Sequence, residues 1–150
     1  IPIFPVPCGE RDEAKEARVG ERVNAYFYDD EFAQAKSAYL ADWRADHRHS
    51  TFPAWVHEAI TLHAARTPAE RAHAAQQRQV RSPRGAMRNW TVLDGTRDTI
   101  TAARRDDEQL DRFLAESTWI AEAIHTAVQQ SAQRHGHLPP APARLPNRLS

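Results

Sequence analysis

Apolar and polar side chains alternate along residues 22–28, where Val23, Ala25 and Phe27 fall on one side. Alternation with a period of two, over β-branched and aromatic residues, predicts a short β-strand with one buried face. The other side of this strand would carry the remaining residues, which are Arg22, Asn24, Tyr26 and Tyr28.

Helical spacing follows the predicted strand. Apolar residues recur every three or four positions from Phe32 to Trp43, behind two aspartates that suit a helix N-terminus. This pattern predicts an amphipathic helix over residues 30–46. After a polar stretch, a second helical stripe begins at Phe52. Pro53 suits the first turn of that helix, because its missing N–H needs no partner there.

The same order of elements recurs later in the chain. The hexapeptide WIAEAI at residues 119–124 nearly repeats WVHEAI at residues 55–60, 64 positions earlier. Each hexapeptide follows an alternating segment at a similar distance, 31 residues after Asn24 and 30 residues after Asn89. Agreement of motif, strand and spacing favours a duplicated unit. The alternative for the end of the second copy is one continuous helix over residues 106–134.

Charge is balanced over the whole chain but segregated along it. Twenty basic and twenty acidic residues give a formal net charge of zero, which argues against a nucleic-acid partner. Residues 10–31 carry eight acids and four bases, whereas residues 66–105 carry nine arginines and three acids. We therefore expect the middle of the chain to form either a positive surface that binds nucleic acid or a solvated, arginine-rich linker.

Other features of the composition narrow the class of protein. Cys8 is the only cysteine, so no intrachain disulfide framework is possible and a reducing compartment is expected. No apolar run approaches the roughly 18 residues of a membrane span. Prolines cluster near both ends of the chain, which predicts disordered or extended tails. We therefore expect a cytoplasmic protein with no membrane segment.

An alternating strand, two helices and a Ser/Thr-rich entry to the second helix resemble the ribbon-helix-helix family of DNA-binding proteins, to which Arc and MetJ belong. Residues 22–27, RVNAYF, are similar to the reading strand of the plasmid-partition branch. Residues 51–60, TFPAWVHEAI, and residues 115–124, AESTWIAEAI, are similar to the second helix of that family. The resemblance covers residues 22–65 and, less fully, residues 88–130.

The resemblance implies a mainly α fold with short β-strands, built as two ribbon-helix-helix units in tandem. Their two strands would pair within one chain, as a pseudo-dimer, or between the chains of a homodimer. The expected parts are a flexible N-terminal arm (1–20), the first unit (21–65), a basic, partly helical linker (66–87), the second unit (88–134) and a Pro-rich C-terminal tail (135–150).

Proteins of this family place one face of an antiparallel ribbon in the major groove of DNA. The resemblance therefore implies base contacts from both strands, where asparagine suits adenine and arginine suits guanine. A slip of one residue in the second strand would exchange its two faces. The expected base-contacting residues are Arg22, Asn24, Tyr26, Arg88, Asn89 and Thr91.

A Ser-Thr pair stands at the entry to each second helix. Free N–H groups at a helix N-terminus bind anions, so these pairs would hold the phosphates that flank the groove. The alternative is ordinary N-capping by the same side chains. The residues concerned are Ser50, Thr51, Ser117 and Thr118.

The resemblance further implies sequence-specific binding of double-stranded DNA by a bacterial protein, as the centromere-binding factor of a plasmid that also represses its own operon. A ParA-type ATPase is the expected partner, contacted through the N-terminal arm, where Arg11 and Arg18 are candidate contacts. The alternatives are a transcriptional repressor, such as an antitoxin or a relaxosome accessory protein, and a helical protein–protein interaction module that does not bind DNA.

No pattern in the chain predicts catalysis, a metal or a cofactor. The eight histidines lack a cysteine or carboxylate spacing typical of zinc sites. Asp106, Asp107 and Glu108 are consecutive and would point in different directions from a helix, which argues against paired catalytic carboxylates. Trp55 and Trp119 lie on helical stripes and are predicted to be core residues.

Overall fold

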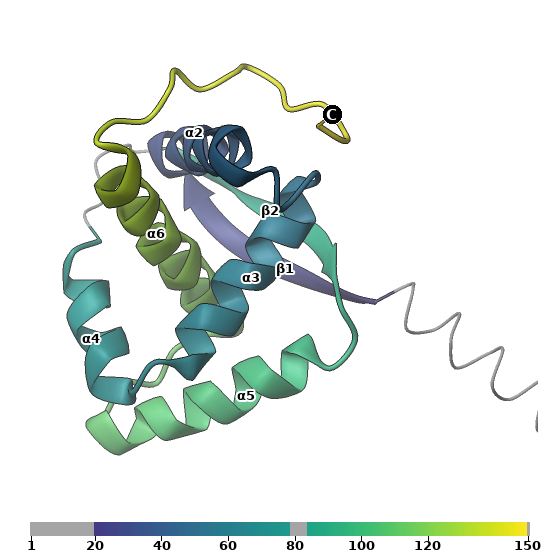
Figure 1. The fold of residues 1–150 in the computed structure, drawn as a ribbon. Coiled ribbons are helices and arrows are strands. Elements are labelled where there is room, and N and C mark those ends of the chain that lie inside the picture. The colour runs from purple at the N-terminus through teal and green to yellow at the C-terminus, as the bar shows by residue number, and fades with distance from the viewer. Residues whose placement is uncertain (1–19, 79–83, 150) are drawn as a thin grey trace, which may run out of the picture.

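A computed structural model describes residues 20–78 and 84–149 of the chain (Figure 1). Its elements occur in the order β1 (Glu21–Tyr28), α2 (Asp29–Asp46), α3 (Phe52–Ala65), α4 (Pro68–Gln76), β2 (Gly85–Val92), α5 (Thr96–Asp107), the short 3-10 helix η1 (Glu108–Leu110) and α6 (Glu116–His135). The predicted first strand and the two helices after it are confirmed. The alternative of one helix over residues 106–134 is wrong, because the chain leaves helical geometry between η1 and α6.

The two strands form a single antiparallel ribbon within the chain. Asn24 lies opposite Asn89, and Glu21 and Tyr28 at the ends of β1 lie opposite Val92 and Gly85. Helix α6 packs against β1, and α3 packs against β2, so helices cover one side of the ribbon (Figure 1). The opposite side of the ribbon has no helix over it in the described part of the chain.

The expected fold class, two ribbon-helix-helix units in tandem, is wrong. The described residues are mainly helical, with five α-helices, 61% of these residues in helix when η1 is counted, and one two-stranded sheet that both halves of the chain share. Three helices rather than two follow β1, because residues 68–76 of the expected linker form α4. Pairing of the strands with each other and packing of α3 on α6 give one hydrophobic core, not two repeated units.

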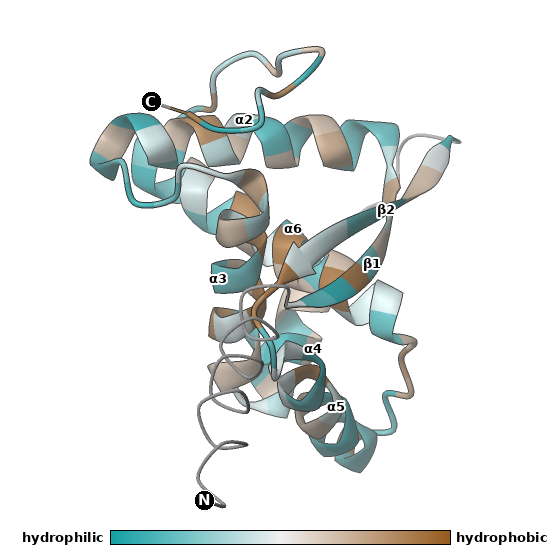
Figure 2. Cartoon of the chain, turned by 90° about the vertical axis from the view of Figure 1, so that its right-hand side faces the viewer, coloured by the Kyte–Doolittle hydropathy of each residue, from teal (hydrophilic) through white to brown (hydrophobic). Residues whose placement is uncertain are grey.

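Both tryptophans of the hexapeptides lie in that core, as predicted. Trp119 is fully buried and Trp55 is 4% exposed. In Figure 2 the hydrophobic segments of α3 and α6 lie on the inside of the molecule, next to the ribbon. The glutamate of each hexapeptide binds an arginine that precedes it by ten residues, in the pairs Arg48–Glu58 and Arg112–Glu122.

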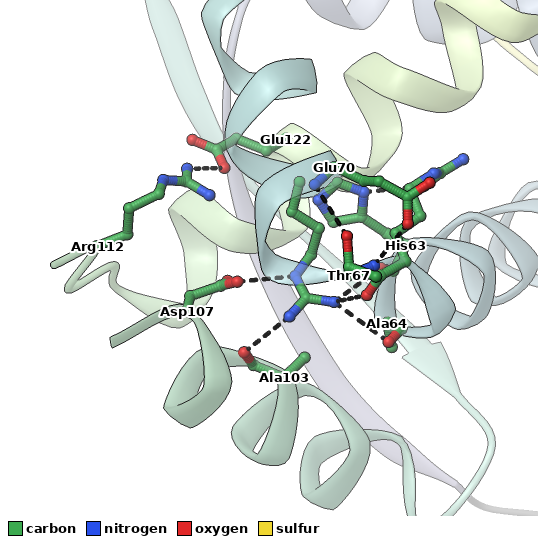
Figure 3. Close-up of polar contacts among 10 residues, drawn as sticks. His63, Ala64, Thr67, Glu70, Ala103, Asp107, Arg112 and Glu122 are labelled. Atoms are coloured by element: carbon green, nitrogen blue, oxygen red, sulfur yellow. Dashed lines mark hydrogen bonds and ion pairs between the residues drawn. The ribbon is translucent and has the colours of Figure 1, made fainter. Parts of the chain in front are cut away.

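Helix α4 is fastened to the rest of the fold by Arg71, whose side chain is 1% exposed. Figure 3 labels several of the residues that Arg71 binds, namely His63, Ala64, Ala103 and Asp107. The Nε of Arg71 donates to Asp107 Oδ1 over 2.9 Å, and its Nη2 donates to the carbonyl of Ala103 over 3.2 Å. Its Nη1 donates to backbone carbonyls at the end of α3, those of His63, Ala64 and Arg66. One guanidinium therefore joins α3, α4 and α5.

The C-terminal residues take no regular secondary structure but pack on the helices. Leu138, Leu145 and Leu149 are partly buried against the hydrophobic core. The ammonium of Lys36, a residue only 8% exposed, donates to the carbonyls of Pro142 at 2.6 Å and Ala143 at 3.2 Å. The tail that was expected to be extended or disordered thus lies along α2, as Figure 1 shows.

Replacing Lys36 with methionine is expected to loosen the tail, because methionine is unbranched and nearly as long as lysine but cannot donate to the two carbonyls. Hydrogen bonds from a charged donor stabilise by roughly 1.5 to 3 kcal/mol, so trypsin should cleave after Arg144 about tenfold faster or more. Limited proteolysis with mass spectrometry measures this rate. Cleavage at the wild-type rate would show that the Lys36 contacts do not hold the tail.

Candidate nucleic-acid interface

The outer face of the ribbon carries three pairs of cross-strand neighbours. Arg22 lies opposite Thr91, Asn24 opposite Asn89, and Tyr26 opposite Met87. All six side chains are exposed to solvent. Five of them are hydrogen-bonding or charged side chains, and side chains directly opposite on one face of an antiparallel pair lie within about 5.5 Å at Cβ. The result is a compact polar surface with two amides at its centre.

The structure brings five of the six expected base-contacting residues together on this face and places Arg88 on the other. Adjacent residues of a strand point to opposite faces, so Arg88 cannot share a face with Asn89. The guanidinium of Arg88 lies 3.8 Å from the centroid of the Phe32 ring, beneath the ribbon. Arg88 therefore stabilises the covered side through a cation–π contact.

The covered face of the ribbon holds the outer face in place. Val23 and Ala25 are fully buried and Phe27 is 2% exposed. The ring of Phe27 meets Trp90 edge to face, with centroids 5.7 Å apart. Because this face is apolar and packed, a slip of one residue would bury the polar residues, and the register is strongly specified.

At one end of the ribbon, Gly85 makes room for the aromatic side chains of β1. A Cβ on Gly85 would lie 2.6 Å from the carbonyl oxygen of Phe27 and 2.8 Å from the ring of Tyr26. Tyr26 also meets Tyr28 edge to face, with centroids 5.5 Å apart. Any larger residue at position 85 would push Tyr26 away from its place on the outer face.

The same end of the ribbon is joined to α2 and to the segment after α4 by Glu31. Its Oε1 accepts from the backbone N–H of Tyr28, and both of its oxygens accept from Arg78, at 2.6 and 2.9 Å. Burial alone would raise the pKa of Glu31, but the hydrogen bonds from Arg78 and Tyr28 outweigh burial and lower the pKa. The carboxylate therefore stays ionised and fixes the end of β1 against α2.

Polar contacts at the other end connect the ribbon to the N-terminus of α6. The backbone N–H of Arg97 donates to Glu21 at 3.3 Å, and its guanidinium lies 3.3 Å from a carboxylate oxygen of Glu116. Glu116 is the first residue of α6, and Ser117 and Thr118 follow it in the first turn. These two expected phosphate contacts are partly exposed near the edge of the ribbon.

The N-termini of α3 and α6 differ in the backbone N–H groups that remain free to bind an anion. Thr51 caps α3 by accepting from the N–H of Ala54, and Pro53 has no N–H to give. The carbonyl of Ser50 accepts from Leu149 of the C-terminal tail at 2.7 Å. The capping alternative thus describes what Thr51 does, whereas within the described chain no side chain caps α6. The first turn of α6 therefore has N–H groups without a side-chain cap, and it also holds the carboxylate of Glu116.

Two arginines at the ends of the ribbon were not among the expected site residues. Arg84 directly precedes β2 and is exposed, and Arg97 is exposed in the first turn of α5. The arginine-rich composition of residues 66–105 pointed to this region, but only the fold shows that these two arginines lie at the ends of the ribbon. Arg11 and Arg18, the expected ATPase contacts, lie outside the described residues.

Within residues 20–78 and 84–149, no group of histidine, cysteine and carboxylate side chains could hold a metal ion. Among the same residues, no helix has the length and apolar content that crossing a membrane requires. Comparison with known proteins gives no match to a family model, to a curated protein or to a solved structure.

Proposed function

We propose that this protein binds double-stranded DNA with the outer face of the β1–β2 ribbon. The observation that carries the proposal is the exposed, polar face formed by three cross-strand pairs on an otherwise packed ribbon. A two-stranded ribbon fits the major groove of B-DNA, where base edges present distinct donor and acceptor patterns. The resemblance to ribbon-helix-helix proteins points to the same mode of docking.

Sequence would be read by the central amides. Asn24 and Asn89 face one another across the ribbon, so a groove-bound ribbon would present both amides to neighbouring base pairs. Asparagine can bond adenine through two hydrogen bonds, and each such contact contributes about 1 to 3 kcal/mol of discrimination. Arg22 and Tyr26 stand on either side of Asn24 and would extend the reading surface along the groove.

Phosphates would be held at the borders of the ribbon. The uncapped N-terminus of α6, with Ser117 and Thr118, offers backbone and hydroxyl donors. Arg84 and Arg97 border the ribbon at its two ends. Contacts of this kind position a protein on DNA without reading its sequence, and they make its affinity fall as salt rises.

The narrower roles implied by the resemblance are proposals of the same kind. Centromere binding for plasmid partition, with autorepression and a ParA-type ATPase as partner, and repression by an antitoxin-like regulator would both use this surface. A helical module that binds proteins alone would leave the polar face of the ribbon without a ligand. Its binding would also lack the linear dependence of log affinity on log salt that phosphate contacts produce.

Replacing both Asn24 and Asn89 with alanine tests the reading surface. The preferred site is first selected from a pool of random duplexes with the wild-type protein. Loss of one to two bidentate contacts should reduce the preference for that site over random DNA by roughly 10- to 100-fold. Fluorescence anisotropy at fixed salt measures both affinities. Non-specific affinity and the salt slope should change little, because phosphate contacts remain.

Asn147→Ala is the matched control, since Asn147 is an exposed asparagine of the C-terminal tail. This variant should keep the wild-type preference. The proposal fails if the wild-type protein selects no sequence and shifts no duplex at low salt. It also fails if the folded Asn24/Asn89 variant discriminates as well as the wild type does.

A further inference from the structure

Both strands of the ribbon come from the same chain, and their sequences differ. In a ribbon made of two copies of one strand, a twofold axis makes the two ends identical. The corresponding axis here passes between Asn24 and Asn89, the one cross-strand pair in the ribbon that joins identical residues. Met87 stands at the position that this axis relates to Arg22. The two ends of the outer face therefore differ in chemistry.

One end of the outer face carries hydrogen-bonding groups. Arg22 lies opposite Thr91, and both side chains are exposed. Within residues 20–78 and 84–149, no side chain or carbonyl forms a hydrogen bond or an ion pair with the Arg22 guanidinium. The adjacent acid, Glu21, alternates to the covered face and accepts from the backbone N–H of Arg97. All five donors of the Arg22 guanidinium are therefore open to a ligand.

The other end of the outer face is apolar and aromatic. Tyr26 is 40% exposed, and Met87, which lies opposite it, is 52% exposed. The ring of Tyr28 meets that of Tyr26 edge to face and supports it from the side. Side chains directly opposite on one face lie within about 5.5 Å at Cβ, so Tyr26 and Met87 form one apolar contact surface.

In the major groove of DNA these two ends match different bases. Arginine bonds N7 and O6 of guanine, whereas apolar side chains contact the C5-methyl group of thymine. The pairs at the two ends lie four positions apart along β1. That separation is roughly 13 Å at about 3.3 Å per residue, which equals about four base-pair steps of roughly 3.4 Å. The outer face is therefore long enough to contact different bases with its two ends.

We propose that a single chain binds an asymmetric duplex site, with guanine at the Arg22 end of the ribbon, adenine at its centre and thymine at the end formed by Tyr26 and Met87. This assignment rests on the proposed function and adds to it the polarity of the site and the number of chains that fill it. A ribbon shared by two identical chains would instead select a palindrome, because its two ends are the same.

Selection from random duplexes tests the symmetry of the site. The wild-type protein should enrich a core without twofold symmetry, and a duplex that carries one such core should bind one chain. Sedimentation velocity of the labelled duplex with saturating protein measures the mass of the complex. Enrichment of a palindromic core, filled by two chains, would overturn the asymmetric assignment.

Base analogues placed in the selected core test each end separately. Deoxyuridine in place of thymidine removes the C5-methyl group, and 7-deazaguanine in place of guanine removes the N7 acceptor. Each contacted methyl that is lost should weaken wild-type binding by about twofold to fourfold, because less apolar surface is buried. Loss of N7 should weaken it by about threefold to tenfold, because one bond of the bidentate contact is gone. Fluorescence anisotropy at fixed salt measures both effects.

Two variants assign these effects to residues, and each is the matched control for the other. The double variant Tyr26→Ala/Met87→Ala should lose the deoxyuridine effect and keep the 7-deazaguanine effect. Arg22→Gln should lose the 7-deazaguanine effect and keep the deoxyuridine effect. All three side chains are exposed, so far-ultraviolet circular dichroism should show an unchanged fold in both variants.

Analogues without effect on the wild type, or effects that persist in the variants designed to remove them, would overturn the asymmetric assignment. In either case a selected site that still depends on Asn24 and Asn89 would leave the proposed function standing. If the wild-type protein selects no sequence and shifts no duplex at low salt, the proposed function fails, and the assignment of bases to its two ends fails with it.

Discussion

Replacing Asp107 with alanine is expected to lower the free energy of unfolding by about 3 to 5 kcal/mol, the typical cost of leaving a buried charge without its partner. Asp107 and Arg71 are each 1% exposed, and their side chains meet at 2.9 Å. Without the carboxylate, the Arg71 guanidinium stays enclosed by α3, α4 and α5 with only carbonyl oxygens as partners. Urea unfolding followed by far-ultraviolet circular dichroism measures the loss.

Asp106→Ala is the control for this experiment. Asp106 is the preceding residue of α5, but it is exposed, and exposed substitutions usually change stability by less than about 0.5 kcal/mol. Arg71→Lys should also destabilise the fold, because an ammonium cannot reach Asp107, the carbonyls at the end of α3 and the carbonyl of Ala103 at once as the planar fork does. A loss below 1 kcal/mol in Asp107→Ala would show that the ion pair does not hold α4 in place.

The same residue shows where sequence patterns stop being informative. Asp106, Asp107 and Glu108 looked alike in sequence, as consecutive acids on a helix surface. Helical geometry correctly separates their directions, but only the tertiary packing of α4 on α5 shows that Asp107 points inward to an arginine 36 positions earlier. A pairing at that separation has no local pattern.

The local periodicity of apolar residues correctly predicted the elements whose pattern is strong, β1 and α3. The alternation at residues 22–28 gave β1 and its buried face, and the stripe around Trp55 gave α3. The second strand was expected around Asn89, within a unit beginning at residue 88, whereas it runs from Gly85 to Val92. Its first half, GAMR, has no alternation, since pairing with β1 rather than intrinsic pattern makes it a strand.

The alternation of side chains along a strand predicted which residues lie on the outer face of the ribbon. The one residue wrongly assigned to that face breaks this alternation. Asn24 and Asn89 were aligned by spacing alone, and the structure places them opposite each other. Arg88 was included for its chemistry, although a strand cannot show residues 88 and 89 on the same face.

Acid is expected to destabilise this fold from about pH 6.5 downward, because His63 is held neutral. His63 is fully buried, and burial lowers its pKa to about 3, helped by the positive charges of Arg66, Arg71 and Arg112. In the unfolded chain the imidazole has a pKa near 6.5 and takes up a proton. The unfolded state thus binds more protons than the folded state between pH 6.5 and 3, so stability falls as pH falls.

The expected slope is about 1.4 kcal/mol per pH unit once the pH is well below 6.5, for a total on the order of 4 kcal/mol by pH 3. His57 and His125 have pKa values that burial lowers in the same direction, and they add to the effect. The pKa values of Glu31 and Asp42 are lowered in the folded protein. These two groups therefore change the stability only at pH values below the ordinary pKa of a carboxyl group. Measurements between pH 7 and 5 therefore isolate the histidines.

His63→Leu should flatten this dependence, since leucine fills a similar volume beside Trp119 and does not titrate. The Arg66 guanidinium, which lies 2.9 Å from His63 Nδ1, is only partly buried and can turn to water in the variant. His73→Leu is the matched control, because His73 is an exposed histidine of α4 and should leave the slope unchanged. Equal slopes in the wild type and His63→Leu would place the acid sensitivity elsewhere in the molecule.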